Sequence, residues 1–98
     1  MDFVILLSWR EGLTEEQQDE ALIRRSGWDY PEGMTRIAEH WTTSQAPAVV
    51  VIASADEYAP IWAMAANWQD KFDVDVLPAI SADEGIQVGA DILGSRMR

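Results

Sequence analysis

Two short apolar runs constrain the fold of this chain more than any other feature of its sequence. One lies within residues 2–9 and the other within residues 48–53, and neither shows the polar–apolar alternation of a half-exposed strand. Strands without this alternation are buried on both faces. We therefore expect a sheet that needs cover on both sides, built from 98 residues that form one domain with a thin core.

Turn residues and periodicity predict the remaining elements. Residues 34–42 and 72–80 alternate as strands do, and the aspartates of the latter suit a sheet edge. Thr14 and Gln17 have capping-box spacing, which predicts a helix over residues 15–26. Asp56 is expected to cap a second helix over residues 57–69. Its core-facing stripe is predicted to comprise Tyr58, Ile61, Trp62, Ala65, Trp68 and Phe72.

The order strand, helix, strand, strand, helix, strand predicts an α+β fold of the ferredoxin-like βαββαβ type. Its four-stranded antiparallel sheet would carry both helices on one face. Since the other face is also apolar, we expect a second subunit's sheet to cover it, giving a homodimeric α+β barrel. We assign residues 1–80 to this barrel domain and residues 81–98 to an extra C-terminal helical tail.

Several short motifs carry a family resemblance. They are a first strand ending near Trp9, the turn Pro31-Glu32-Gly33, Trp41, Asp56, the run Trp68-Gln69-Asp70, and Val76-Leu77-Pro78. Over residues 1–80 the chain resembles domain-of-unknown-function family 3303, in the dimeric α+β barrel superfamily. The resemblance implies the fold and the dimer. It implies no activity, because none is assigned to the family, and the superfamily ranges from cofactor-independent monooxygenases to haem enzymes.

Composition excludes several classes of function. The formal net charge of −10 repels phosphate, so we expect no binding to nucleic acid or to anionic membranes. The absence of cysteine excludes disulfides, thiolate metal sites and a cysteine nucleophile. One histidine without matching carboxylates predicts no metal, and we expect no cofactor. The run at residues 3–7 is too short for a secretion signal or a membrane span, so we expect a cytoplasmic protein.

His40, the only histidine, is the candidate catalytic residue. Imidazole exchanges protons near neutral pH, which suits acid–base catalysis. Strand alternation would place His40 on the same face as Arg36, which would then bind an anionic group of a substrate. The alternative is a strand-end histidine hydrogen-bonded to backbone. Glu39 on the opposite face would have a raised pKa and act as a base if buried, although simple exposure is the competing interpretation.

Five tryptophans are many for this length. Trp9, Trp28 and Trp62 are the candidate walls of a ligand pocket, with Arg36 as its polar group. The competing interpretation is that the tryptophans fill a thin core and anchor a dimer interface.

Two functions therefore remain open. The first is a homodimeric barrel that binds a small apolar or aromatic molecule, with cofactor-independent catalysis left undecided. The second is a non-catalytic protein-interaction module that docks through the dimer or the C-terminal tail. A cavity large enough for a ring compound would favour the first function, and a filled core would favour the second.

Overall fold

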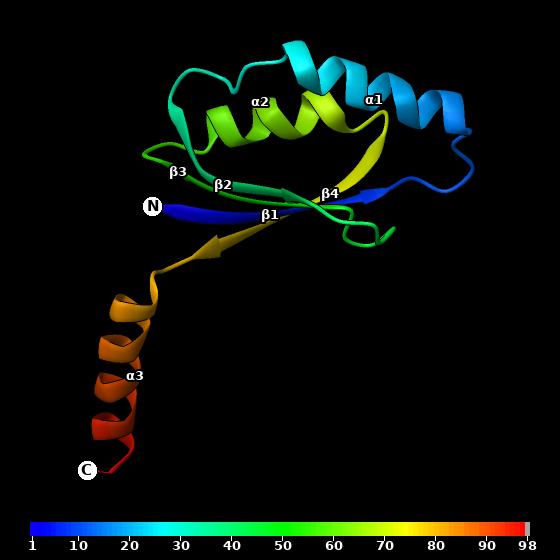
Figure 1. Cartoon of the computed structure of the whole chain (residues 1–98). Coiled ribbons are helices and arrows are strands. Elements are labelled where there is room, and N and C mark those ends of the chain that lie inside the picture. The colour runs from blue at the N-terminus through cyan, green and yellow to red at the C-terminus, as the bar shows by residue number, and fades with distance from the viewer. Residues whose placement is uncertain (98) are drawn as a thin grey trace.

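The computed structural model describes residues 1–97 and has the predicted element order (Figure 1). Its elements are β1 (Asp2–Trp9), α1 (Glu15–Gly27), β2 (Met34–Trp41), β3 (Val49–Ala55), α2 (Ala59–Trp68), β4 (Phe72–Ala79) and α3 (Ala82–Arg96). The four strands form one antiparallel sheet in the order β2-β3-β1-β4. The ferredoxin-like α+β prediction is confirmed, including the edge position of the last strand.

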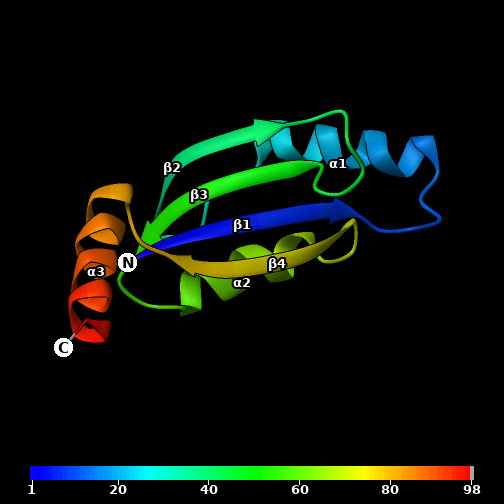
Figure 2. The same cartoon turned by 90° about the horizontal axis from the view of Figure 1, so that it is seen from below.

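One face of the sheet is covered and the other is open. Helices α1 and α2 both lie on one face of the sheet, and neither helix covers the opposite face (Figures 1 and 2). The core lies between the helices and the covered face. It is built from every second residue of β1 and β3 and from one side of α2: Phe3, Ile5, Leu7, Val49, Val51, Ala53, Ile61, Met64 and Trp68. The intervening residues of β1 and β3 include Val4, Leu6, Val50 and Ile52, which are only half-buried.

Local signals position α1 and the turn that follows it. The Thr14 hydroxyl accepts a hydrogen bond from the Gln17 backbone N–H (3.1 Å), and the Gln17 side chain accepts one from the Thr14 N–H (2.9 Å), which confirms the capping box. Gly33 has a φ of 95°, and a Cβ at this position would lie 2.8 Å from Pro60 Cγ. Only glycine therefore fits where the chain enters β2 beneath the start of α2.

The start and the orientation of α2 differ from the prediction. The helix begins at Ala59 after Tyr58, which makes no side-chain cap, so the assignment of Asp56 as the cap is wrong. Ile61, Met64 and Trp68 form the buried stripe, while Trp62 is 68% exposed. Successive helical residues are rotated by about 100°, so packing through Ile61 turns Trp62 outward.

A β-bulge in β2 changes which side chains share a face. Arg36 pairs with Ala53 and Ala38 pairs with Ile52, so Ile37 is the extra residue on the β2 strand. Arg36 therefore shares the covered face with buried Ala53, whereas His40 pairs with Val50 on the open face. The prediction that Arg36 and His40 lie on one face is wrong, because the bulge inverts the alternation between them.

The C-terminal helix α3 stands apart from the domain. The Ser81 hydroxyl caps it by accepting a hydrogen bond from the Glu84 N–H at 3.2 Å. The helix projects past the end of the sheet, on the side away from α1 and α2 (Figures 1 and 2). None of residues 82–96 is buried, and its exposed apolar residues include Ile86, Val88, Ile92 and Leu93.

Candidate functional site

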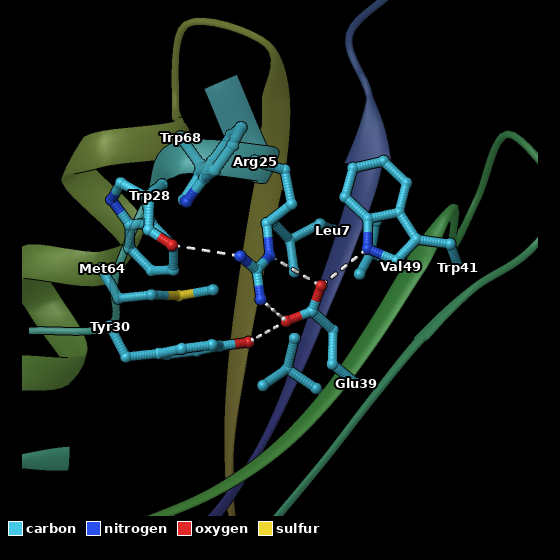
Figure 3. A pocket seen from close by; sticks show the side chains of 10 residues that line it. Leu7, Arg25, Trp28, Tyr30, Glu39, Trp41, Val49, Met64 and Trp68 are labelled. Carbon is cyan, nitrogen blue, oxygen red and sulfur yellow. Dashed lines mark hydrogen bonds and ion pairs between the residues drawn. The ribbon is translucent and has the colours of Figure 1, made fainter. Parts of the chain in front are cut away.

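A cluster of four polar side chains lies between the end of α1 and the covered face of β2. We call Arg25, Tyr30, Glu39 and Trp41 the Glu39 cluster. Arg25 comes from the last turns of α1, Tyr30 from the connection to β2, and the other two from the end of β2 (Figure 3). The alternation of β2 after the bulge places Glu39 and Trp41 opposite Val51 and Val49, two residues of the core.

Glu39 is the centre of the cluster, and its side chain is only 8% exposed. One carboxylate oxygen, Oε1, accepts hydrogen bonds from Arg25 Nη2 (2.8 Å) and the Tyr30 hydroxyl (2.5 Å). The other, Oε2, accepts from Arg25 Nε (2.9 Å) and Trp41 Nε1 (2.7 Å) (Figure 3). Four donors thus satisfy one carboxylate, and two of them belong to a planar guanidinium whose geometry matches it.

These contacts hold Glu39 in its charged form. Burial by itself would raise the pKa of the Glu39 carboxyl, but the hydrogen bonds from Arg25, Tyr30 and Trp41 outweigh it and lower the pKa to about 2. Burial and the bond to Glu39 raise the pKa of the Tyr30 hydroxyl. The sequence-based suggestion that a buried Glu39 would have a raised pKa is therefore wrong, because its donors were not visible in the sequence. A carboxylate held in this way is a poor general base.

Aromatic rings enclose the Arg25 guanidinium. Its Cζ lies 5.7 Å from the centre of the Trp28 ring and 5.6 Å from that of Tyr30, which are cation–π distances. Arg25 also donates to the Trp28 carbonyl at 3.1 Å. The Trp28 ring in turn meets Trp68 edge to face at 5.4 Å, which joins the cluster to the core.

The space left inside this arrangement is small. The recess between the Glu39 cluster and the core has a cavity volume of about 10 Å³. Its walls are Leu7, Arg25, Trp28, Tyr30, Glu39, Trp41, Val49, Val51, Met64 and Trp68. That volume suits one water molecule and not a ring compound. The tryptophans at this end of the domain therefore act as core fillers in this structure.

The structure separates the residues that the sequence predicted to form one site. Trp28 lines the recess, and Trp9 lies beside it, stacked on Phe72 at 4.3 Å. Arg36 lies at the rim, with Nη1 3.8 Å from Glu39 Oε1. Trp62 points outward from α2, and His40 lies on the open face of the sheet. His40 and the tryptophans therefore do not share a cavity in the protomer.

Sequence reasoning missed Arg25 and Tyr30 as members of the site. The sequence did place Glu39 and Trp41 on one face, and an acidic residue two positions from a tryptophan on a core-facing strand needs a buried donor. Arg24 and Arg25 both lie at the end of α1, and only the structure shows that Arg25 is the one that binds Glu39.

The described part of the chain holds neither a metal ligand set nor a membrane-spanning helix. Among residues 1–97, no three carboxylate or imidazole side chains gather as a metal ligand set. None of the helices described is long and apolar enough to cross a membrane.

The fold and the open sheet face define the class of this protein as a ferredoxin-like α+β domain. The chain belongs to the DUF3303 family, a domain of unknown function, whose family model matches residues 1–93. The match extends beyond residue 80, where the sequence-based resemblance was expected to end, and includes α3 as far as Leu93. No curated protein and no solved structure matches this chain.

Proposed function

We propose that this protein is a homodimeric binding module in which the open faces of two sheets pack together. One observation carries the proposal: the centre of the open face is apolar. We call Val4, Leu6, Val50 and Ile52 the open-face patch. They are neighbours in the sheet, since Leu6 pairs with Val50 and Val4 pairs with Ile52. Leu77 on β4 extends the patch and is 49% exposed.

A second sheet is the partner that fits this patch best. Apolar surface of this kind is removed from water when two sheets stack about 10 Å apart with their side chains interdigitated. A twofold dimer uses the same patch on both copies, so no further partner is needed to cover it. The half-buried state of the patch residues in the protomer leaves area for such burial.

Sedimentation velocity of two variants tests the proposal. Leu6→Lys places a charge in the open-face patch, and we expect it to convert a wild-type dimer into a folded monomer. The matched control is Ile23→Lys, which changes an apolar residue of α1 that is 72% exposed on the helix layer, and it should leave the dimer intact. A monomeric wild-type protein at every concentration would refute the proposal, and so would a Leu6→Lys variant that remains dimeric.

Helix α3 offers the module a second surface. Three glycines weaken this helix, by about 1 kcal/mol each, and isolated helices of its length are marginal in water. Its exposed apolar side chains are therefore expected to bind a protein surface. Deletion of residues 82–98 should abolish association with such a partner while the sheet domain stays folded by circular dichroism. Unfolding of the truncated chain would show instead that α3 serves the stability of the domain.

Small-molecule binding is the second candidate function, because three tryptophans and a tyrosine line the recess. A ring compound would enter only if Trp41, which is 36% exposed, moved aside. Trp41→Ala should therefore enlarge the recess and tighten binding of indole, measured by NMR shifts of the Trp28 and Trp68 side chains. The matched control is Trp62→Ala, on the outer side of α2. Equal indole binding by both variants would count against a site in the recess.

A catalytic role for His40 stays a prediction, and in the proposed dimer its imidazole would lie at the edge of the interface and not in the recess. Cytoplasmic location likewise stays a proposal, supported by the acidic, cysteine-free composition.

A further inference from the structure

The strand register aligns four open-face residues in a row across the whole sheet. His40 on β2 pairs with Val50, Val50 pairs with Leu6, and Leu6 pairs with Asp75 on β4. Directly opposed residues of antiparallel strands point to the same face. The row therefore begins with an imidazole at one sheet edge, crosses the open-face patch and ends with a carboxylate at the other edge.

A second row lies beside the first and is apolar throughout. It runs Ala38, Ile52, Val4, Leu77 in the same order of strands. Asp73, which pairs with Ser8, adds another exposed carboxylate to the β4 edge of the open face, and Arg10 Nε lies 3.9 Å from its Oδ1. The open face is thus apolar in the middle, acidic along β4, and carries the chain's single histidine along β2.

This charge pattern distinguishes two ways of packing the faces. A twofold axis that runs across the strands places β4 over the partner's β4. The Asp73 and Asp75 carboxylates of both copies then gather on one side of the dimer, with both imidazoles on the other. Arg10 is a counter-charge for Asp73, whereas none of the ion pairs of residues 1–97 includes Asp75. This packing therefore brings the two Asp75 carboxylates together without a counter-charge, which opposes association.

A twofold axis parallel to the strands, between β1 and β3, gives the opposite result. It places β2 over the partner's β4 and superimposes each row on the same row of the partner. Val50 then faces the partner's Leu6, and Ile52 faces the partner's Val4. His40 faces the partner's Asp75, so a basic group meets a carboxylate at both edges of the interface.

We propose that the dimer forms about this parallel axis, with His40 of each protomer paired to Asp75 of the other. The inference rests on the proposed face-to-face dimer and specifies its register. The bulge at Ile37 is what places His40 on the open face, where it can pair with Asp75 of the other protomer. Unbroken alternation from buried Met34 would turn His40 to the covered face and Glu39 to the open one.

A double-mutant cycle on the homodimer dissociation constant tests the pairing. Within one chain, His40 and Asp75 are three strand spacings apart, about 14 Å, so they do not contact each other. Any strong coupling between them must therefore act between protomers. His40→Glu should weaken the dimer at least about tenfold by facing a carboxylate, and H40E/D75K should return the dissociation constant to within about threefold of wild type.

Cross-linking gives an independent measurement of the axis, because the chain has no cysteine of its own. A mixture of H40C and D75C chains treated with a short bismaleimide should yield covalent dimers, whereas D75C alone should yield few. Efficient cross-linking of D75C to itself, with no recovery in H40E/D75K, would overturn the parallel axis while leaving the face-to-face dimer intact. A monomeric wild-type protein, or a dimer insensitive to Leu6→Lys, would overturn both proposals.

Discussion

Arg25 at the end of α1 and Glu39 on β2 form a bidentate ion pair that joins the helix layer to the sheet. Its two hydrogen bonds, Nε to Oε2 and Nη2 to Oε1, measure 2.9 Å and 2.8 Å. Tyr30 and Trp41 complete the carboxylate's set of donors. Removing one member of such a buried set leaves the others unsatisfied, so the cluster is a sensitive point of the fold.

Glu39→Gln should lower the free energy of unfolding by about 3 kcal/mol, because the Arg25 guanidinium would lose its counter-charge in a partly buried site. The measurement is urea denaturation followed by tryptophan fluorescence. Glu57→Gln, at an exposed position before α2, is the matched control and should change the value by no more than about 0.5 kcal/mol. Equal stabilities of the two variants would show that the ion pair contributes nothing.

The contribution of Glu39 to stability should depend on pH in one direction. Its folded pKa of about 2 lies below the ordinary value of about 4.3 in an unfolded chain, so the folded state favours the charged form. The difference in unfolding free energy between wild type and Glu39→Gln should be constant above about pH 5. It should then fall by about 3 kcal/mol as pH decreases through the window between the two pKa values. A difference that stays constant from pH 6 to pH 2 would contradict the assignment.

Two glycines with positive φ should respond differently to alanine. Gly12 has a φ of 81° and open space where a Cβ would lie, so Gly12→Ala should cost only about 1 kcal/mol of backbone strain. Gly33→Ala adds a clash with Pro60 Cγ at 2.8 Å and should cost about 1–3 kcal/mol more. Thermal denaturation measures both. Recovery of part of the loss in G33A/P60A would identify Pro60 as the cause, and equal losses in the two single variants would exclude the clash.

Deletion of Ile37 should leave the domain folded and lower the free energy of unfolding by no more than about 2 kcal/mol. Without the extra residue, Arg36 and Ala38 become neighbours opposite Ala53 and Ile52, which are themselves neighbours on β3. Regular alternation then keeps Glu39 and Trp41 on the covered face and His40 on the open face. Ile37→Ala keeps the bulge and removes a side chain that is 57% exposed, so it should cost less than about 1 kcal/mol. Unfolding of the deletion variant, or loss of its native near-ultraviolet circular dichroism, would contradict this register and show that the bulge itself is required.

Local sequence signals were sufficient for the elements and their order. The capping box at Thr14, the glycine at position 33 and the period of each apolar run act within a few residues, so they can be recognised without knowing the fold. Apolar residues on both sides of β1 and β3 likewise indicated that one sheet face would remain without cover from the chain's own helices.

The composition of the site was decided by contacts between distant residues. Arg25 and Glu39 are on separate elements, and only the packing of α1 on the sheet brings a cation to a carboxylate that would otherwise be buried alone. The same contacts set the direction of the Glu39 pKa shift, since burial and hydrogen bonding act in opposite senses and only the geometry shows which is larger.

The sequence by itself therefore determined the βαββαβ order, the edge strand and the apolar residues on both faces of the two central strands, because each follows from periodicity and turn chemistry along the chain. Only the tertiary structure decided which side chains meet. One unpaired residue at Ile37 reverses the direction of every later side chain in β2, and a rotation of about 100° separates buried Ile61 from exposed Trp62. Neither the reversal after Ile37 nor the outward position of Trp62 can be recognised in the sequence pattern, because both result from how whole elements pack against one another.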